Sequence, residues 1–123
     1  MTDIKDALDH ARAQVQELHK SIEAQANKDH AAIRASLQTA GEHARDLGLS
    51  VRVLAERQGA DVKDHLKDVA AHLDEAAKHA KTAATASAAD VKNANRVALE
   101  RTRDALQSLS KAVAAHRSTA VKS

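Results

Sequence analysis

The sequence has no cysteine, no proline and no aromatic residue, and its 123 residues include only three glycines. The absence of cysteine excludes disulfides, thiolate metal sites and a cysteine nucleophile. Serine-nucleophile motifs need a glycine-flanked turn and phosphate-binding motifs need glycine-rich loops, so both lack the residues they require. We therefore expect a protein that is not an enzyme.

The lack of aromatic rings also weighs against nucleic-acid binding, because no base can be stacked on such a chain. The basic residues of the C-terminal part are interspersed with Asp90, Glu100 and Asp104. Residues 89–123 carry seven basic and three acidic side chains, an excess that could meet phosphate or could complement the dipole at the end of a helix. We expect no nucleic-acid partner.

Long apolar segments are missing as well. The first twenty residues carry charges throughout and contain no apolar signal-peptide segment. No stretch approaches the length of about 20 apolar residues that spans a membrane. The sequence predicts a cytoplasmic protein, although a mature exported chain would look the same.

What the chain does contain is alanine and branched aliphatic residues in helical order. There are 29 Ala and 23 Leu, Ile or Val residues, and the apolar positions recur mainly at steps of three and four, which keeps them on one side of an α-helix. Such small side chains stabilise a monomer only marginally, so we expect a homo-oligomer. The predicted core residues are Ile4, Leu8, Ala11, Val15, Leu18, Ile22, Ile33, Leu37, Ala40, Ala44, Leu47, Val51, Leu54, Val62, Leu66, Val69, Leu73, Ala76, Ala80, Ala83, Val91, Ala94, Ala98, Thr102, Ala105, Leu109 and Val113.

Three slips in the phase of this pattern occur around residues 26–30, 58–62 and 87–91. The second slip contains Gly59, which suits a left-handed helix end. It is followed by Asp61 and Asp64, which have the spacing of an N-cap and an acidic N3 residue. We therefore predict a turn at Gly59.

The predicted fold is all-α and consists of long antiparallel amphipathic helices in one domain, residues 1–123. The arms of the helical hairpin are expected at 3–57 and 61–118, and two hairpins are expected to pair into a coiled-coil-like four-helix bundle. The alternative takes all three slips as turns, which gives a monomeric four-helix bundle from segments of about 28 residues.

Two local features do not follow the helical pattern simply. Gly41 and Gly48 lie seven residues apart on one helix face, where they either let a neighbouring helix approach closely or mark a bend. A nearby stretch alternates as a strand would, but a single strand has no partner here, so we predict helix. The alternating residues are Leu47, Leu49, Val51 and Val53.

Histidine and acidic residues alternate along one flank of the predicted helix that follows Gly59. Steps of four and three bring such side chains within reach of a shared ion, and imidazole with carboxylate suits Cu, Ni or Zn. The structural alternative is a row of ordinary surface ion pairs. No histidine has glutamate three positions before it, which excludes the Glu-x-x-His site of ferritin-like bundles. The candidate metal ligands are His65, His72 and His79, with Asp61, Asp68 and Glu75 as supporting carboxylates.

The segment HLDEAAKHAKTA, residues 72–83, resembles the repeated segments of the bacterial small metal-binding protein family. These proteins are His-rich four-helix bundles that take up divalent metals, and the likeness extends over residues 61–81. It implies a metal-binding role for the three histidines and their acidic neighbours. Separately, the amphipathic pattern of residues 83–120 is similar to apolipoprotein-like and phasin-like helices, which implies a surface-coating role.

Three functions therefore follow from the sequence. The first is a structural or interaction protein that presents long amphipathic helices to a protein partner or to itself. The alternative is binding or storage of a divalent metal on the histidine stripe; apart from such a metal, no cofactor is expected. A coat on a lipid membrane or polymer granule is a further alternative, disfavoured because an alanine-rich face without rings packs better against another helix.

Overall fold

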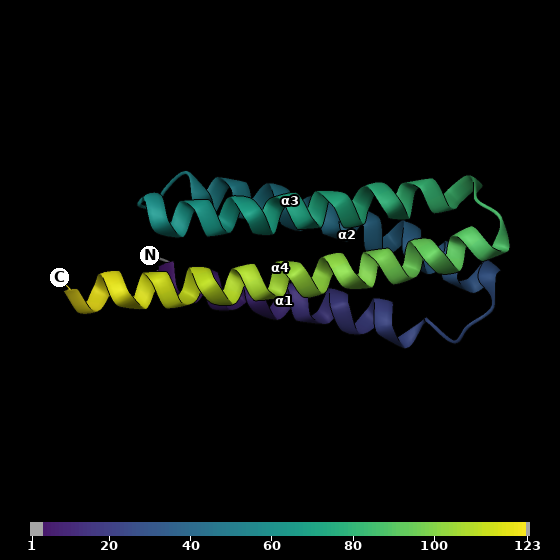
Figure 1. Cartoon of the computed structure of the whole chain (residues 1–123), viewed down its shortest axis with the longest axis horizontal. Helices are drawn as coiled ribbons and strands as arrows, with labels where there is room; N and C mark the ends of the chain where they lie inside the picture. The colour runs from purple at the N-terminus through teal and green to yellow at the C-terminus, as the bar shows by residue number, and fades with distance from the viewer. Residues whose placement is uncertain (1–3, 123) are drawn as a thin grey trace.

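The chain forms four long helices in sequence, α1 (Ile4–Ala24), α2 (His30–Ala55), α3 (Ala60–Thr82) and α4 (Ala88–Lys122), with a short 3₁₀ turn, η1 (Ala83–Thr85), before α4. The computed structural model describes the backbone of residues 4–122 and the side chains of residues 5–117 other than Ala84. The helices run up, down, up and down, so that the start of α1 and the end of α4 lie at the same end of the bundle (Figure 1). This part of the chain contains no strand, so the predicted all-α class is confirmed.

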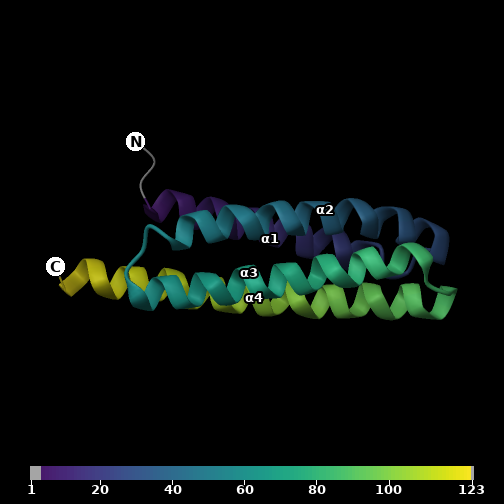
Figure 2. The same ribbon diagram turned by 90° about the horizontal axis from the view of Figure 1, so that it is seen from above.

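The helices are arranged as a ring in which each packs against its neighbours in sequence and α4 closes onto α1. Seen from above, α1 and α2 lie on one side and α3 and α4 on the other (Figure 2). The closest packing is between α3 and α4 and between α2 and α3, whereas α1 packs more loosely against α2. One chain thus forms a complete four-helix bundle.

All three phase slips are turns, so the chain folds into four helices, as in the alternative prediction, and not into a hairpin of two continuous arms. The two continuous arms, 3–57 and 61–118, are each divided by a further turn, and residue 3 lies outside the described residues. Short polar side chains explain the extra breaks, because they cap the helix that follows. Asp29 accepts a hydrogen bond from the backbone N–H of Ala32 at 2.8 Å, and Ser87 accepts one from that of Asp90 at 3.3 Å.

The turn at Gly59 is confirmed, but its geometry differs from the prediction. Gly59 is the N-cap of α3 with φ −68° and ψ 167°, which is extended backbone, and no residue of the described range has a positive φ. The predicted N-cap, Asp61, lies inside the first turn of α3. A left-handed residue is not needed because the amides of Glu56 and Arg57 already bond to carbonyls of the last turn of α2.

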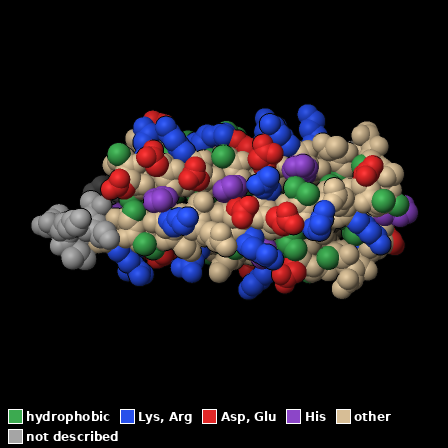
Figure 3. Space-filling model, in the orientation of Figure 1, with side chains coloured by type: hydrophobic (Ala, Val, Ile, Leu, Met, Phe, Trp, Pro, Cys, Tyr) green, Lys and Arg blue, Asp and Glu red, His purple; other side chains and the backbone are tan. Residues whose placement is uncertain are grey.

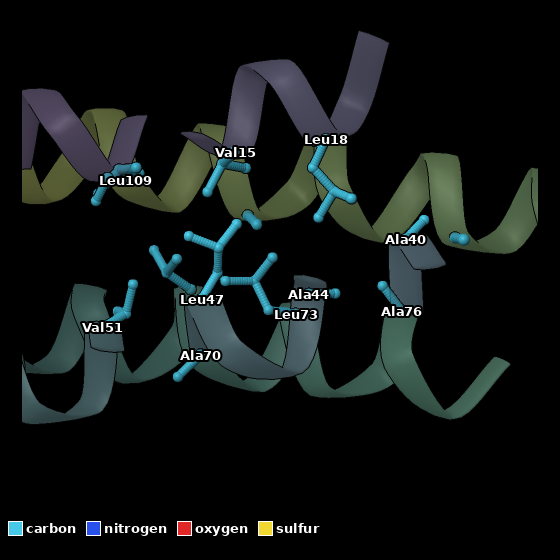
Figure 4. Close-up of a cluster of buried hydrophobic side chains, with 14 of the residues drawn as sticks. Val15, Leu18, Ala40, Ala44, Leu47, Val51, Ala70, Leu73, Ala76 and Leu109 are labelled. Atoms are coloured by element: carbon cyan, nitrogen blue, oxygen red, sulfur yellow. The ribbon is translucent and has the colours of Figure 1, made fainter. Parts of the chain in front are cut away.

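The apolar rows form the core, as predicted. Residues from all four helices meet at the centre of the bundle, including Val15 of α1, Leu47 of α2, Leu73 of α3 and Leu109 of α4 (Figure 4). Every predicted core residue with a described side chain is buried, except Leu54, which is partly buried and packs against the others. The side chain of Ile4 lies outside the described residues.

Gly41 and Gly48 let α2 and α3 approach closely, which decides between the two alternatives left open by the sequence. A Cβ atom on Gly41 would lie 2.7 Å from the Cβ of Ala80, and one on Gly48 would lie 3.1 Å from the Oδ1 of Asp74. Real Cβ atoms do not approach another carbon that closely, so only glycine fits at position 41 without a shift of the helices.

The contact of α1, and of the residue that follows it, with α4 includes buried polar side chains. The side-chain amide of Gln25 donates to Asn95 Oδ1 at 2.6 Å, and both residues are buried. Six residues before Gln25, within α1, the His19 imidazole Nδ1 lies 2.9 Å from the hydroxyl of Thr102, which is also buried. These hydrogen bonds tie α1 to one register on α4, because a shift would leave buried polar groups without partners.

Replacing Gly41 with alanine is expected to lower the free energy of unfolding by about 1–2 kcal/mol. Separating α2 from α3 costs more than the higher helix propensity of alanine offsets. Urea unfolding followed by circular dichroism measures the change. Adding Ala80→Gly should recover part of the loss, and Gly59→Ser, where nothing lies within 4 Å, should stay within about 0.5 kcal/mol of the wild type. Equal stability of Gly41→Ala and wild type would contradict this packing.

Candidate functional site

Two large apolar side chains on α2 face solvent. Leu49 is 51% exposed and Val53 is 60% exposed, and no other large hydrophobic residue with a described side chain is as exposed. They are four residues apart and therefore adjacent on the helix surface. We call these two residues the α2 ridge.

The ridge explains the strand-like alternation in the sequence. Successive residues of a helix are rotated by about 100°, so residues two apart lie on nearly opposite sides. Leu47 and Val51 point into the core with 4% and 1% exposure, while the residues two positions later, Leu49 and Val53, point away from it. The alternation therefore reflects two apolar faces on one helix, and only the inner face serves the fold of the single chain.

Charged residues flank the α2 ridge on both sides. Arg45 and Arg52 line the groove between α2 and α3, and Glu56 reaches toward the same side, where its carboxylate lies 3.5 Å from the ammonium of Lys63. Arg57 lines the groove between α1 and α2. Asp46 lies one turn before Ser50, which also lines that groove, so the α1-side flank carries Asp46 and Arg57.

Most of these charges have no partner within the bundle. The side chains of Arg45, Asp46 and Arg57 form no ion pair or hydrogen bond with any described residue, whereas Arg52 is paired with Asp74 of α3. Exposed charges of this kind cost little when solvated. They also leave the flanks of the ridge free to pair with another molecule.

The grooves beside the ridge are open depressions in the surface. The larger, of about 930 Å³, lies between α2 and α3, and its lining includes Gly41, Ala71 and Ala77, since small side chains leave space between two closely packed helices. The smaller, of about 400 Å³, lies between α1 and α2 and is lined in part by Val53 and Leu54.

The predicted metal ligands all lie on α3. Histidine side chains recur along the face shown in Figure 3, over α3 and with acidic and basic residues between them. His65 and His72 are half-buried, whereas Asp61 and Asp68 are exposed. Because two helical turns span about 11 Å, His65 and His72 cannot hold the same ion from one helix.

Glu75 and His79 are the two predicted ligands that the structure brings together, with 4.0 Å between carboxylate and imidazole. The same carboxylate lies 3.8 Å from the ammonium of Lys78, which competes with a cation for it. Over the residues whose side chains are described, no three His, Asp or Glu residues gather in a group that could hold a metal ion. Any site on the stripe would need side chains to change rotamer, or ligands from a second molecule.

In the sequence, Leu49 and Val53 stand out only as members of a strand-like alternation, which assigns them no role. The signal was there, because both residues are out of phase with the apolar row that runs through Leu47 and Val51. The buried hydrogen-bonded pair Gln25 and Asn95 was missed, because amides next to an apolar row look like ordinary surface residues.

Comparison of the chain with family models, curated proteins and solved structures found no match in any of the three. The likeness to small metal-binding proteins therefore stays a prediction. Among residues 4–122, no helix is apolar over a length that could cross a membrane.

The α2 ridge should contribute nothing to the stability of the isolated bundle. Leu49→Gln with Val53→Gln is expected to change the free energy of unfolding at low protein concentration by less than about 0.5 kcal/mol, as is usual for exposed positions. The matched control, Leu47→Gln with Val51→Gln, makes the same changes two residues earlier and should cost more than about 4 kcal/mol, because it buries polar groups and opens cavities. Thermal unfolding by circular dichroism compares the two; a similar loss in both would mean that the ridge is part of the core.

Proposed function

We propose that this protein is a non-enzymatic interaction protein that binds another protein, or a second copy of itself, through the α2 ridge. The observation that carries the proposal is the exposure of Leu49 and Val53 on a bundle whose other large apolar side chains, as far as they are described, are buried or partly buried. Two adjacent apolar residues with charged residues on both flanks have the composition of a small helix-docking surface, in which an apolar centre is rimmed by polar groups.

The closed bundle supports an interaction role over a surface coat. The apolar faces of the four helices are turned toward one another, so a lipid or granule surface would meet mainly charged side chains and the ridge. Coating would require the bundle to open, which exposes the core and breaks the buried bond between Gln25 and Asn95.

Site-specific photo-crosslinking tests the interaction role. A benzophenone amino acid at position 53, in cells that make the protein, is expected to give a discrete adduct that mass spectrometry identifies as a second copy or as another protein. The same amino acid at position 103, an exposed site on α4, is the control and should give none. Adding Leu49→Gln should remove the adduct at position 53, because it removes the apolar neighbour.

The proposal fails if positions 53 and 103 give the same pattern of adducts, or if Leu49→Gln leaves the adduct at position 53 unchanged. Either result would mean that the ridge has no defined partner.

Divalent metal binding is the second candidate function. It is supported by His65 and His72, which have no hydrogen-bond or ion-pair partner among the described residues and are therefore available as ligands, and by the proximity of Glu75 to His79. Neutral imidazole with carboxylate is a common ligand combination for borderline divalent metals. The site would be low in ligand number unless two molecules share it.

Calorimetric titration with Ni²⁺ at pH 7.5 tests the metal candidate. Binding with a dissociation constant in the range of about 1–100 µM is expected, and it should be lost when His65, His72 and His79 are all replaced by Gln. The control variant replaces His10, His30 and His43, which are exposed and lie off the stripe, and removes the same number of imidazoles. Equal binding by both variants, or no binding by the wild type, would rule out the stripe as the site.

A further inference from the structure

The residues on the outer side of α2 are arranged symmetrically about Val51. Leu49 lies two residues before Val51 and Val53 two residues after it. Asp46 lies five residues before Val51, and Arg57 lies six residues after it. Arg45 lies six residues before it, and Glu56 lies five residues after it. Each of these pairs joins residues that attract each other: two apolar side chains, or an acid and a base. A surface whose complementary residues are placed evenly about one point is complementary to itself.

A twofold axis perpendicular to α2 at Val51 would place a second α2 antiparallel to the first. In that arrangement a residue faces the residue of its own flank that lies, to within one position, at the mirrored distance from Val51. Leu49 therefore meets Val53 of the second copy, and Val53 meets its Leu49. The rotation also keeps each flank next to the same flank of the other molecule. Asp46 therefore meets Arg57 on the α1 side, because Arg57 lines the groove there and Asp46 lies one helical turn before Ser50, which lines it too.

The flank on the α3 side is matched in the same way. Arg45 and Glu56 both lie toward α3, and the rotation brings Arg45 of each copy to Glu56 of the other. Near the axis on this flank the two copies of Arg52 come close. Their charges are already offset, because each Arg52 is paired with Asp74 of its own chain.

A parallel twofold pairing is less favourable. It would also place opposite charges together, since Arg45 would face Asp46 of the other copy. However, Glu42 lies seven residues before Leu49 on the same line of the helix and has no partner among the described residues, and a parallel pair would set the two Glu42 carboxylates against each other. The antiparallel pair carries Glu42 past the end of the other α2, which ends at Ala55, and it aligns the helix dipoles favourably.

We propose that the α2 ridge docks a second copy of this chain, as an antiparallel twofold dimer of bundles centred on Val51. This inference rests on the proposed interaction role of the ridge and names its partner. The contact from Arg45 to Arg57 spans about 18 Å, or three to four helical turns. It is short compared with interfaces that bury about 1,200–2,000 Å², so the dimer forms reversibly and its affinity depends on salt.

Reversing the charges of Asp46 and Arg57, singly and together, tests the antiparallel dimer. Asp46→Arg alone, or Arg57→Glu alone, places like charges together at both ends of the dimer and is expected to weaken self-association by about tenfold. The double variant Asp46→Arg/Arg57→Glu restores opposite charges across an antiparallel dimer and should return the dissociation constant to within about threefold of the wild type. In a parallel dimer, the double variant would instead be the weakest of the three.

Sedimentation equilibrium between about 1 µM and about 1 mM covers the concentrations at which weak specific association becomes visible. Interference optics are required because the chain has no aromatic residue. The variant Leu49→Gln/Val53→Gln should be monomeric throughout this range. Circular dichroism of every variant checks that the bundle is folded, which is expected because Asp46 and Arg57 are exposed.

A monomeric wild type up to about 1 mM overturns the dimer, as does a double variant that associates more weakly than either single variant. In both cases an adduct between position 53 and a different protein would still support the interaction role. If position 53 gives no specific adduct at all, the interaction role fails with the dimer.

Discussion

The fold depends on close contact between helices whose facing side chains are small. With no aromatic rings to fill space, the core reaches normal packing density only if the backbones themselves approach one another. The contact of Gly41 with Ala80 shows how near α2 and α3 come, because a single added carbon would collide. Four helices enclose such a core on all sides, whereas two helices of twice the length would leave one face of each helix open. This is a physical reason for the chain to use all three phase slips as turns.

Small side chains also create a difficulty, because rows of alanine fit together almost equally well after a shift of one turn. The α1–α4 contact removes this freedom. The buried amides of Gln25 and Asn95 bond to each other at 2.6 Å, and Asn95 also donates to the carbonyl of Ile22 at 3.4 Å. In a shifted register these groups would be buried without hydrogen-bond partners. Polar residues inside the bundle therefore specify which of several similar packings is formed. Arg34 of α2 acts similarly at the same end of the bundle, where its guanidinium donates to the carbonyls of Ala83 and Ala86 in the connection between α3 and α4.

The core could be predicted from the sequence because burial follows directly from the period of the apolar residues. Interruptions of that period marked all three turns, but the preferred hairpin had only the turn at Gly59. The capping roles of Asp29 and Ser87 at the other two turns are consistent with their residue types. The backbone conformation of Gly59 could not be predicted, because glycine suits both a left-handed helix end and an extended N-cap, and only the hydrogen bonds of the preceding residues decide between them. The histidine stripe shows a similar limit: spacing along α3 brings ligands to one flank, but it does not say which carboxylates and imidazoles turn toward each other, and only Glu75 and His79 do.

Because the α2 ridge lies outside the core, association through it would be separate from folding of the chain. A hairpin with an open seam would need a second copy to complete its core, and folding and dimerisation would then be one process. Here the core is complete within one chain, so association is left to the surface, where it is weaker, reversible and sensitive to charge. The proposed pairing through α2 would also leave the histidine stripe accessible, because His65, His72 and His79 do not line the groove that α3 shares with α2. Of the predicted ligands only Glu75 lines that groove, so the two functions would overlap at that one residue, and loss of the histidines need not abolish self-association.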